Sequence, residues 1–368
     1  MNSKVAVTGA GGYIGSILVQ ALLEQGYHVR AVDMFFFGEA ALSKAHGHPF
    51  LEVVRQDTRS INPVTFEDCD CVIDLAALSN DPSGNLDPDL TRSINERGRT
   101  RVSMAAECAG VRRYLFASSC AVYGGSQEMD LSETAGLNPL TIYAETCARA
   151  EEAVLARNSR WFTTASLRNA TVFGLSPRMR FDLVVNQMTH DALERGRITI
   201  GGDGTQWRPL VHVRDIAGAF LLALRAPRSA IGGHAFNIGW KNYQVDSVAH
   251  AVRRAIDVPA DIVYQPATSD RRNYHVSFSK AERTFGFKAS RTVEEAVVEI
   301  AQAILGKRLS NTPACHTVEW YSRLLAERGP GLRLPGTVPM HASAQEPASN
   351  TIIARDLAGG LPAVEFVQ

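Results

Sequence analysis

The chain has 368 residues, and its 38 lysines and arginines balance 38 aspartates and glutamates, so its formal charge at pH 7 is zero. A balanced charge gives no field that would draw the protein to nucleic acid or to an anionic membrane, and no apolar run is long enough to span a bilayer. Six cysteines without CxxC or metal-ligand spacing, and a strand pattern close to Met1 where a signal peptide would lie, predict a reduced, cytoplasmic protein without a structural metal.

The chain begins with the pattern of a strand, a glycine-rich turn and a helix. Residues 4–8 are an apolar run, Gly9, Gly12 and Gly15 follow at once, and apolar side chains then recur at helical spacing. Glycines at this spacing allow a tight turn, let the backbone approach a pyrophosphate and let the helix pack close to the strand. The anion lies at the helix N-terminus, so the segment predicts a dinucleotide site.

An acid follows the second predicted strand. Residues 27–32 are largely apolar, and Asp33 comes directly after them. An acid at this place accepts hydrogen bonds from the adenosine ribose and repels a 2′-phosphate, which favours NAD over NADP. A glycine-rich turn in another kind of α/β protein is the alternative interpretation.

Strand-like and helix-like segments alternate further along the chain. Additional strands are predicted at 50–54, 71–75, 113–117 and 163–167, and amphipathic helices at 90–109 and 141–157. This alternation is typical of an α/β fold with a Rossmann-type doubly wound parallel sheet. We assign 1–174 to an NAD-binding domain, 175–330 to a smaller C-terminal substrate-binding lobe with some chain crossing back, and 331–368, rich in Pro, Gly, Ala and Ser, to an extension without an assigned role.

Five segments in chain order carry a family resemblance. They are the glycine turn from Thr8 with Asp33, Asp57 within Arg-Gln-Asp-Thr, Leu75-Ala-Ala-Leu-Ser79, Ser118-Ser-Cys-Ala-Val-Tyr-Gly124, and Gln206-Trp-Arg-Pro-Leu-Val-His-Val-Arg-Asp215. From about residue 4 to about residue 305, the chain resembles the extended short-chain dehydrogenases/reductases of the NDP-sugar epimerase and dehydratase group. The resemblance implies NAD as cofactor, an NDP-sugar as substrate and a homodimer.

The resemblance also implies which residues bind the cofactor. Asp57 falls where the family has an acid beside the adenine, and residues 75–77 resemble the segment beneath the nicotinamide. The implied cofactor-binding residues are Gly9, Gly12, Tyr13, Ile14, Gly15, Asp33, Asp57, Thr58, Leu75, Ala76, Ala77, Tyr143 and Cys147.

Tyr143 is the candidate base. Oxidising a sugar hydroxyl to a ketone requires a base for the hydroxyl proton while the carbon gives up a hydride, and a tyrosinate can serve if its pKa falls well below about 10. Ser119 matches the family's catalytic hydroxyl, which holds the substrate oxygen as charge develops, and Ser118 is the flanking alternative. Otherwise Tyr143 is an ordinary helix tyrosine and both serines merely end a strand.

Cys147 departs from the family pattern. Relatives have a lysine four residues after the tyrosine, on the same helix face, where its ammonium stabilises the phenolate and holds the nicotinamide ribose. A neutral thiol supplies no cation, and no lysine occurs between Lys44 and Lys241, so any replacement cation is an arginine. Three alternatives stay open: Tyr143 acts with a higher pKa, Cys147 or Cys120 takes part as acid or base, or the protein keeps NAD without turnover, whether naturally or through an engineered substitution.

Residues 120 and 121 narrow the reaction. In the 4,6-dehydratase branch of the family an acid pair at these positions eliminates water from the sugar, whereas this chain has Cys120 and Ala121. Epimerisation needs no such pair, because the keto intermediate turns over in the pocket and takes the hydride back on its other face. We therefore predict an NAD-dependent nucleotide-sugar epimerase that oxidises a sugar hydroxyl, at C4, to a ketone. A ketoreductase or dehydrogenase and a catalytically silent binding protein are the alternatives.

Arginines supply the candidate phosphate ligands, because a planar guanidinium makes bidentate contacts to phosphate. Similar positions in the family hold the nucleotide diphosphate, and solvated surface arginines are the alternative. The candidate arginines are Arg178, Arg180, Arg208, Arg271 and Arg272. Thr171 stands where relatives carry an asparagine. The candidate sugar-pocket residues are Ser79, Asn80, Asp81, Ser119 and Asn169.

The helices predicted at 90–109 and 141–157 resemble those that form an intersubunit four-helix bundle in the family, so we expect a homodimer. The first helix contains four arginines, which we expect to be solvated rather than paired across the interface. They are Arg92, Arg97, Arg99 and Arg101.

Overall fold

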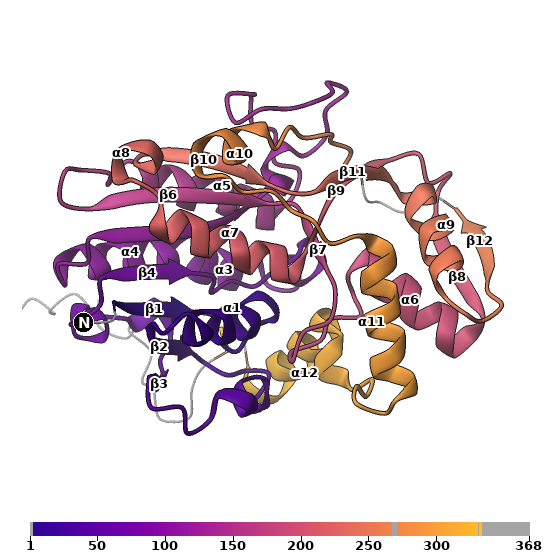
Figure 1. Cartoon of the computed structure of the whole chain (residues 1–368), viewed down its shortest axis with the longest axis horizontal. Coiled ribbons are helices and arrows are strands. Elements are labelled where there is room, and N and C mark those ends of the chain that lie inside the picture. Colours follow the sequence, from indigo (N-terminus) through magenta and orange to yellow (C-terminus); the bar gives the residue numbers. More distant parts are fainter. Residues whose placement is uncertain (1–2, 267–270, 330, 333–368) are drawn as a thin grey trace, which may run out of the picture. The chain divides into compact units, whose positions relative to one another are not determined.

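The computed structural model describes residues 3–266, 271–329 and 331–332, and every structural statement below refers to these residues. The predicted C-terminal extension lies outside them except for its first two residues. The largest sheet has seven parallel strands in the order β10-β6-β5-β4-β1-β2-β3 (Figure 1). The strands are β1 (Lys4–Thr8), β2 (His28–Asp33), β3 (Leu51–Arg55), β4 (Cys71–Asp74), β5 (Arg113–Ser119), β6 (Thr163–Asn169) and β10 (His234–Ile238).

Side chains alternate between the two faces of this sheet. On β1, Val5 and Val7 belong to one apolar core, and Ala6, between them, belongs to another. Helices α1 and α7 cover the first face and helices α4 and α5 the second, so the central strands are apolar on both faces. The predicted Rossmann-type doubly wound sheet is therefore confirmed. The covering helices are α1 (Tyr13–Glu24), α7 (Val213–Arg225), α4 (Arg99–Cys108) and α5 (Ile142–Leu155).

The strand order reverses between β1 and β4. Strands β2 and β3 continue the sheet on one side of β1, and β4 begins the run on the other side. In open α/β sheets a ligand binds outside the carboxyl ends of the strands at such a switch point. We therefore expect the ligand site of this fold among the residues that follow Thr8 and Asp74.

The chain returns to the large sheet after it has begun a second, smaller lobe. Strand β10 pairs in parallel with β6, with Phe236 opposite Leu167, and α7 lies on the same sheet. The smaller lobe has a three-stranded sheet, β11-β9-β7, and a parallel pair, β12-β8, packed with three helices (Figure 1). Its elements are β7 (Thr171–Phe173), β8 (Arg197–Gly201), β9 (Trp207–His212), β11 (Lys241–Gln244), β12 (Asp261–Gln265), α6 (Val184–Arg195), α9 (Val245–Ala255) and α11 (Val293–Leu305).

The segment predicted as one helix at 90–109 is divided. It consists of α3 (Pro88–Thr91), the π-helical segment η4 (Arg92–Gly98) and α4. Within η4, Asn95 accepts a hydrogen bond from the Leu78 N–H at 2.8 Å and donates one to the Leu78 carbonyl at 3.0 Å. The predicted helix is thus present, and its middle turns are π-helical, which apolar spacing does not reveal because it does not distinguish one helical hydrogen-bond pattern from another. The other short helices are α2 (Asp81–Gly84), α8 (Arg228–Ile231), α10 (Ser279–Phe285), η1 (Ala40–Ala45), η2 (Thr58–Ser60), η3 (Pro63–Phe66), η5 (Cys120–Tyr123) and η6 (Pro313–Cys315).

Helix α12 (Thr317–Arg328) packs against the loop that follows β2. Trp320 Nε1 donates a hydrogen bond to the Phe36 carbonyl at 2.8 Å, and the rings of Phe37 and Tyr321 meet edge to face with centroids 5.4 Å apart. The contact joins residues far apart in the sequence and buries Tyr321 and Leu324.

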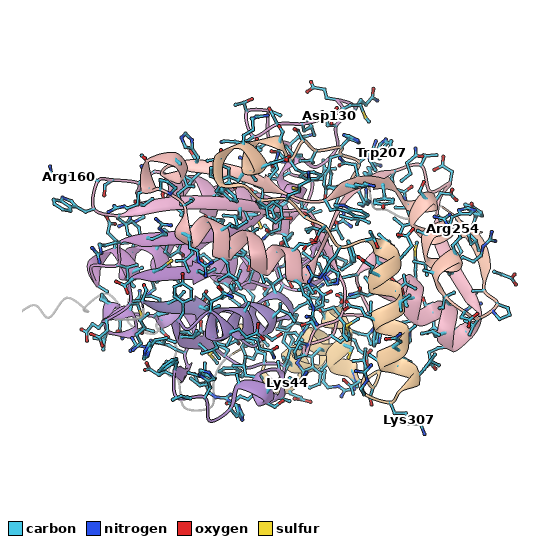
Figure 2. All side chains as sticks on the ribbon, viewed as in Figure 1. Lys44, Asp130, Arg160, Trp207, Arg254 and Lys307 are labelled. Atoms are coloured by element: carbon cyan, nitrogen blue, oxygen red, sulfur yellow. The ribbon has the colours of Figure 1, made fainter. Side chains whose placement is uncertain are left out.

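Several charged side chains lie at the periphery of the described chain, among them Lys44, Arg160, Arg254 and Lys307 (Figure 2). Among the described residues, no helix is both long and apolar enough to cross a membrane.

Candidate active site

The glycine turn closes tightly between β1 and α1. Gly9 has a φ of +68°, and its carbonyl oxygen accepts a hydrogen bond from the Gly12 N–H at 3.0 Å. A Cβ atom at Gly15 would lie 2.1 Å from the Gly9 oxygen, and one at Gly9 would lie 2.8 Å from the Ala76 nitrogen. The turn therefore requires glycine at both positions. It presents the N-terminus of α1 at the end of β1 with no capping side chain in between, as pyrophosphate binding requires.

Asp33 ends β2 beside this turn. Its carboxylate accepts hydrogen bonds from the Gly11 N–H at 2.9 Å and the Phe35 N–H at 2.7 Å. Burial raises the pKa of this carboxyl group, and the two N–H groups and the Arg178 guanidinium oppose the rise. The acid is thus held beside the turn, where we predict its contact with the adenosine ribose.

Asp57 is held by its neighbour Arg59. The two side chains form an ion pair at 2.5 Å, and Asp57 also accepts the Arg59 N–H at 2.8 Å, which caps the short helix η2. Any contact of Asp57 with an adenine would therefore be made alongside this ion pair.

A single cleft at the carboxyl ends of β1, β2 and β4 brings most of the predicted residues together. Within the described part of the chain, Cys120, Cys147, Arg208 and Arg271 are the candidates that do not line it. Asn80, Asp81 and Ser118 line it as well. The predicted cofactor and substrate residues that line the cleft are Gly9, Gly12, Tyr13, Ile14, Gly15, Asp33, Asp57, Thr58, Leu75, Ala76, Ala77, Ser79, Ser119, Tyr143, Asn169, Arg178, Arg180 and Arg272.

Tyr143 and Ser119 come to this cleft from adjacent elements. Tyr143 lies in the first turn of α5, which Thr141 caps by accepting the Ala144 N–H at 3.2 Å. Ser119 is the last residue of β5, and its Oγ accepts the Ala121 N–H at 3.1 Å. Burial raises the pKa of the Tyr143 phenol well above its ordinary value. Activation of this phenol therefore depends on a stabilising charge.

Cys147 lies beneath Tyr143 on α5. The thiol is buried, packs in one cluster with Tyr143 and has its pKa raised to about 11, chiefly by burial. It is therefore neutral near pH 7 and supplies no charge to the phenol.

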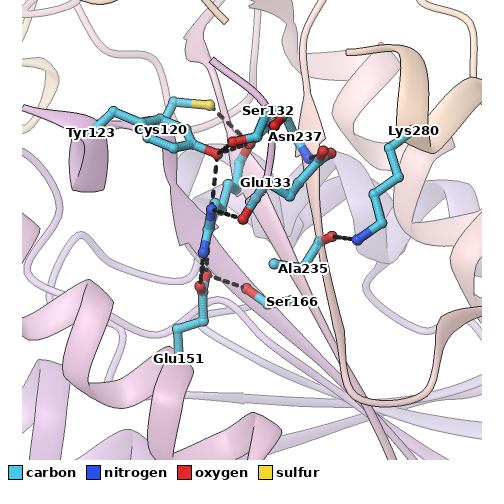
Figure 3. A network of polar contacts seen from close by, with 10 residues as sticks. Cys120, Tyr123, Ser132, Glu133, Glu151, Ser166, Ala235, Asn237 and Lys280 are labelled. Atoms are coloured by element: carbon cyan, nitrogen blue, oxygen red, sulfur yellow. Dashed lines mark hydrogen bonds and ion pairs between the residues drawn. The ribbon is translucent and has the colours of Figure 1, made fainter. Parts of the chain in front are cut away.

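Cys120 belongs to a buried polar network on the side of β5 away from the cleft lining. Its Sγ donates to the Arg168 carbonyl at 3.1 Å, and burial raises the pKa of its thiol. Arg168 pairs with Glu151 at 2.6 Å and donates to the Tyr123 hydroxyl at 2.8 Å, and that hydroxyl donates to Asn237 at 2.8 Å (Figure 3). The network ties the end of β5 to α5, β6 and β10, which explains Cys120 as part of the framework.

Arg99 is a correction to the prediction that the arginines of its helix are solvated. Its side chain is 1% exposed and forms a buried ion pair with Asp74 at 3.0 Å. The guanidinium lies over the Phe116 ring, 3.8 Å from the centroid, and Arg99 lines the cleft. Strand alternation places Asp74 and Phe116 on the face that α4 covers, so the ion pair joins α4 to the strand ends.

Three of the predicted phosphate-binding arginines, Arg180, Arg208 and Arg272, have acidic or backbone partners within the protein. Arg180 pairs with Asp182 at 2.7 Å, and Arg272 forms an ion pair with Asp81. Arg208 donates to the Arg272 carbonyl and so lies behind Arg272 relative to the cleft. The structure therefore brings Arg178, Arg180 and Arg272 to the cleft, and Arg208 supports Arg272 through its carbonyl.

Three buried polar atoms on residues that line the cleft have no hydrogen-bond partner among the described residues. They are Ser118 Oγ, Asn169 Oδ1 and Arg178 Nε. Such atoms are costly to bury unless a ligand or water completes their bonding. Together with the side-chain-free glycine turn, they fit a cleft built for a polar ligand with an anionic group.

Several residues that line the cleft were absent from the sequence prediction. The three phenylalanines that follow Asp33 do give a signal, since an apolar run beyond a strand end indicates a covered loop. Tyr321 reaches the cleft only because α12 docks there, and Arg99 only because its helix turns inward. The missed residues include Phe35, Phe36, Phe37, Arg99, Tyr274 and Tyr321.

Known proteins with similar sequences and structures agree with this geometry. The model of the NAD dependent epimerase/dehydratase family matches residues 5–239. A UDP-glucose 4-epimerase of Mycolicibacterium smegmatis is 28% identical over 313 residues, which span 83% of this chain and 99% of that protein. A UDP-glucuronic acid decarboxylase of Arabidopsis thaliana is 27% identical over 331 residues, 85% of this chain and 72% of that protein. The structure of MoeE5 in complex with UDP-glucuronic acid and NAD is 28% identical, with a TM-score of 0.73, and the match covers 83% of this chain and 100% of that chain.

The family match extends over more than half of the chain, and the chain therefore belongs to the NAD dependent epimerase/dehydratase family. The resemblance to extended short-chain dehydrogenases/reductases of the epimerase and dehydratase group is confirmed. So are the prediction of an enzyme of this class and the prediction of NAD as its cofactor.

Proposed function

We propose that this enzyme is a UDP-sugar epimerase that inverts a sugar carbon, C4, by transient oxidation of its hydroxyl group. The observation that carries the proposal is that Tyr143 and Ser119 line the same cleft as the glycine turn. A hydroxyl that loses both a proton and a hydride must lie within reach of the proton acceptor and of the cofactor. The similar UDP-glucose 4-epimerase, matched over nearly its whole length, supports this activity.

The cofactor would be held by residues at the carboxyl ends of the strands. Gly9, Gly12 and Gly15 would accept its pyrophosphate, Asp33 its adenosine ribose, and residues 75–77 would lie beneath the nicotinamide. NAD, when bound, supplies a hydride acceptor that later returns the hydride to the sugar.

Tyr143 and Ser119 divide the handling of the sugar oxygen. The Tyr143 phenolate takes the hydroxyl proton during oxidation and returns it during reduction. Ser119 Oγ already accepts the Ala121 N–H, so its own hydrogen remains to donate to the sugar oxygen. That donated bond stabilises the charge that develops on the oxygen.

The absence of an acid pair after Ser119 favours epimerisation over dehydration. Ala121 lines the cleft and presents only a methyl group, and Cys120 is buried outside the lining with a raised thiol pKa. These two residues therefore provide neither a proton donor nor an acceptor for elimination of water.

Cationic side chains at the substrate end of the cleft would bind the diphosphate. Arg180 and Arg272 line the cleft and are positioned by Asp182 and Asp81. The ion pairs hold the guanidinium groups in place before binding, which lowers the entropic cost of ordering them.

The activity is tested by incubating the purified protein with UDP-glucose, UDP-N-acetylglucosamine and UDP-glucuronic acid. Sugar configuration is followed by NMR and NADH by absorbance. An epimer without accumulated NADH supports the proposal. A keto sugar with NADH indicates a dehydrogenase or ketoreductase, and loss of the carboxyl carbon from UDP-glucuronic acid indicates a decarboxylase. Tight binding without turnover indicates a silent binding protein. Each of these three results would overturn the epimerase assignment.

The rate should rise with pH. Burial, Cys147 and Asp81 raise the pKa of Tyr143, whereas Arg99 lowers it, and Arg180 lines the same cleft as the phenol. A base with a raised pKa is mostly protonated at neutral pH, so the reactive phenolate increases as the pH increases. In Cys147→Lys an added ammonium would stabilise the phenolate and move this rise to lower pH. The measurement is kcat against pH for both proteins, and a shift to higher pH in the variant would contradict the expected order.

We also propose that the enzyme is a homodimer through the face formed by α4 and α5. The two helices pack side by side, and Met104 and Cys108 of α4 are exposed on a hollow beside Arg97 and Arg101. Sedimentation velocity at micromolar concentration should give about twice the 40.0 kDa mass of the chain. Met104→Glu, which puts a charge on this face, should shift the protein toward monomer; a wild type that sediments only as monomer would contradict the dimer.

A further inference from the structure

We propose that Arg99 supplies, from the neighbouring helix α4, the positive charge beside Tyr143 that a lysine at position 147 would supply from α5. Arg99 is then a positioning residue that acts through the phenol. This inference rests on the proposed role of Tyr143 as the base.

The guanidinium of Arg99 is buried and fixed in orientation. Its Nε donates to Asp74 Oδ2 at 3.0 Å, and its Nη2 donates to the carbonyls of Asp74 and Ala117, each at 2.8 Å. Phe116 supports its flat face. In the described part of the chain, Nη1 forms no hydrogen bond, and Arg99 lines the cleft with Tyr143. One edge of the cation is therefore available to the site.

Arg99 acts on the two residues that replace the family's tyrosine and lysine pair. Its charge lowers the pKa of the Tyr143 phenol, and it is first among the groups that lower the pKa of the Cys147 thiol. Helices α4 and α5 pack together, and the side chains of Arg99 and Tyr143 line the same cleft. In a buried site such interactions are much stronger than in water.

Among the described residues, the hydrogen-bond partners of Arg99 lie at its Nε and Nη2 atoms, and none of them places a carboxylate beside Nη1. Asp74 is fully buried and also accepts hydrogen bonds from the hydroxyls of Thr8 and Tyr114. Its negative charge is shared among three donors, which are Arg99 on α4 and the hydroxyl groups of Thr8 and Tyr114 on the strands. The other acid near the phenol, Asp81, forms an ion pair with Arg272.

A thiol at position 147 is consistent with this arrangement. A lysine there would bring a second buried cation toward Arg99, and like charges at close range are costly to bury. Cys147 is small and neutral, and it packs beside the phenol without adding charge. The substitution at 147 and the arginine at 99 are therefore explained together.

The experiment is an ultraviolet difference titration of tyrosinate, with Tyr143→Phe subtracted to isolate the Tyr143 phenol. Arg99→Met combined with Asp74→Asn removes both buried charges at once and leaves no unpaired ion in the core. The phenol should then titrate at least about one unit higher, because an opposite charge nearby shifts a pKa by about 1–3 units. Asp74→Asn alone leaves Arg99 with its full charge, so the phenol should titrate lower than in the wild type.

Two further measurements separate an electrostatic role from a structural one. Adding Cys147→Lys to the double variant should return the titration toward its wild-type position, because a cation is restored from the other helix. The rise of kcat with pH should move in the same directions, by about tenfold in rate at fixed pH per unit of pKa. Circular dichroism and the Tm establish that each variant is folded; if the double variant is not, the opposite shift in Asp74→Asn remains diagnostic.

The outcomes distinguish this inference from the proposed function. Shifts of the phenol titration without turnover of any UDP-sugar would support the role of Arg99 and remove the epimerase proposal. Turnover that depends on Tyr143, with no shift in either the double variant or Asp74→Asn, would overturn the role of Arg99.

Discussion

Tyr143→Phe is expected to abolish turnover of a UDP-sugar while the protein still folds and binds NAD. The substitution removes only the phenol oxygen, and loss of a positioned general base costs about 10²- to 10⁴-fold in rate. The aromatic ring and the thiol of Cys147 beneath it keep their packing. The measurement is kcat with the preferred UDP-sugar, together with the NAD content of the purified protein.

A matched control makes the same chemical change elsewhere. Tyr243 lies on β11 in the smaller lobe and does not line the described cleft. Tyr243→Phe should therefore turn over substrate at about the wild-type rate. Undiminished turnover in Tyr143→Phe would remove Tyr143 as the proton acceptor, and with it the proposed division of work between Tyr143 and Ser119.

Gly15→Ala is expected to destroy NAD binding. The added Cβ would lie 2.1 Å from the Gly9 carbonyl oxygen and 2.9 Å from the Ala10 Cα, so the turn or the start of α1 must move. Overpacking of this kind costs about 1–3 kcal/mol of free energy or more. A loss of about 1.4 kcal/mol in the free energy of binding weakens the affinity tenfold. Calorimetric titration with NAD measures the effect.

Gly218→Ala is the control for this change. Gly218 lies within α7, and a Cβ there would meet no atom within 4 Å. Alanine is favoured over glycine inside a helix by about 1 kcal/mol, so the control should be at least as stable as the wild type and bind NAD normally. Equal NAD affinity in both variants would mean that the turn tolerates a side chain and that the cofactor is held elsewhere.

Much of the fold could be predicted because the central strands are apolar on both faces. The segments at 4–8, 28–33 and 71–74 are largely apolar and are followed by, or end in, turn or acidic residues, so they can be predicted without knowledge of their neighbours. Strand β10 was not predicted. Its sequence, His234–Ile238, is short and follows the part of the chain where the alternation weakens, and its pairing with β6 is a long-range contact.

The residues of the site, like the strands, include some that local sequence predicts and some that it does not. The glycine turn, Asp33, Ser119 and Tyr143 belong to local motifs, and the structure gathers them in one cleft. Arg99 has no local motif, since arginine on a helix with polar neighbours is normally exposed. Its burial depends on Asp74, a strand-end acid that lies 25 positions earlier in the sequence. Helical periodicity predicts which face of a helix a residue occupies, but it does not predict which charged residue from a distant part of the sequence lies against that face.

The docking of α12 has a consequence for how long a cofactor stays bound. Tyr321 of α12 forms part of the wall of the cleft, and Trp320 fastens the helix to the loop after Asp33. We expect a dinucleotide in this cleft to contact Tyr321, so that substitutions that weaken the docking of α12 should shorten the time it stays bound. An epimerase regenerates its oxidised coenzyme in every cycle, so slow escape would cost it no throughput and would spare it dependence on the free coenzyme pool.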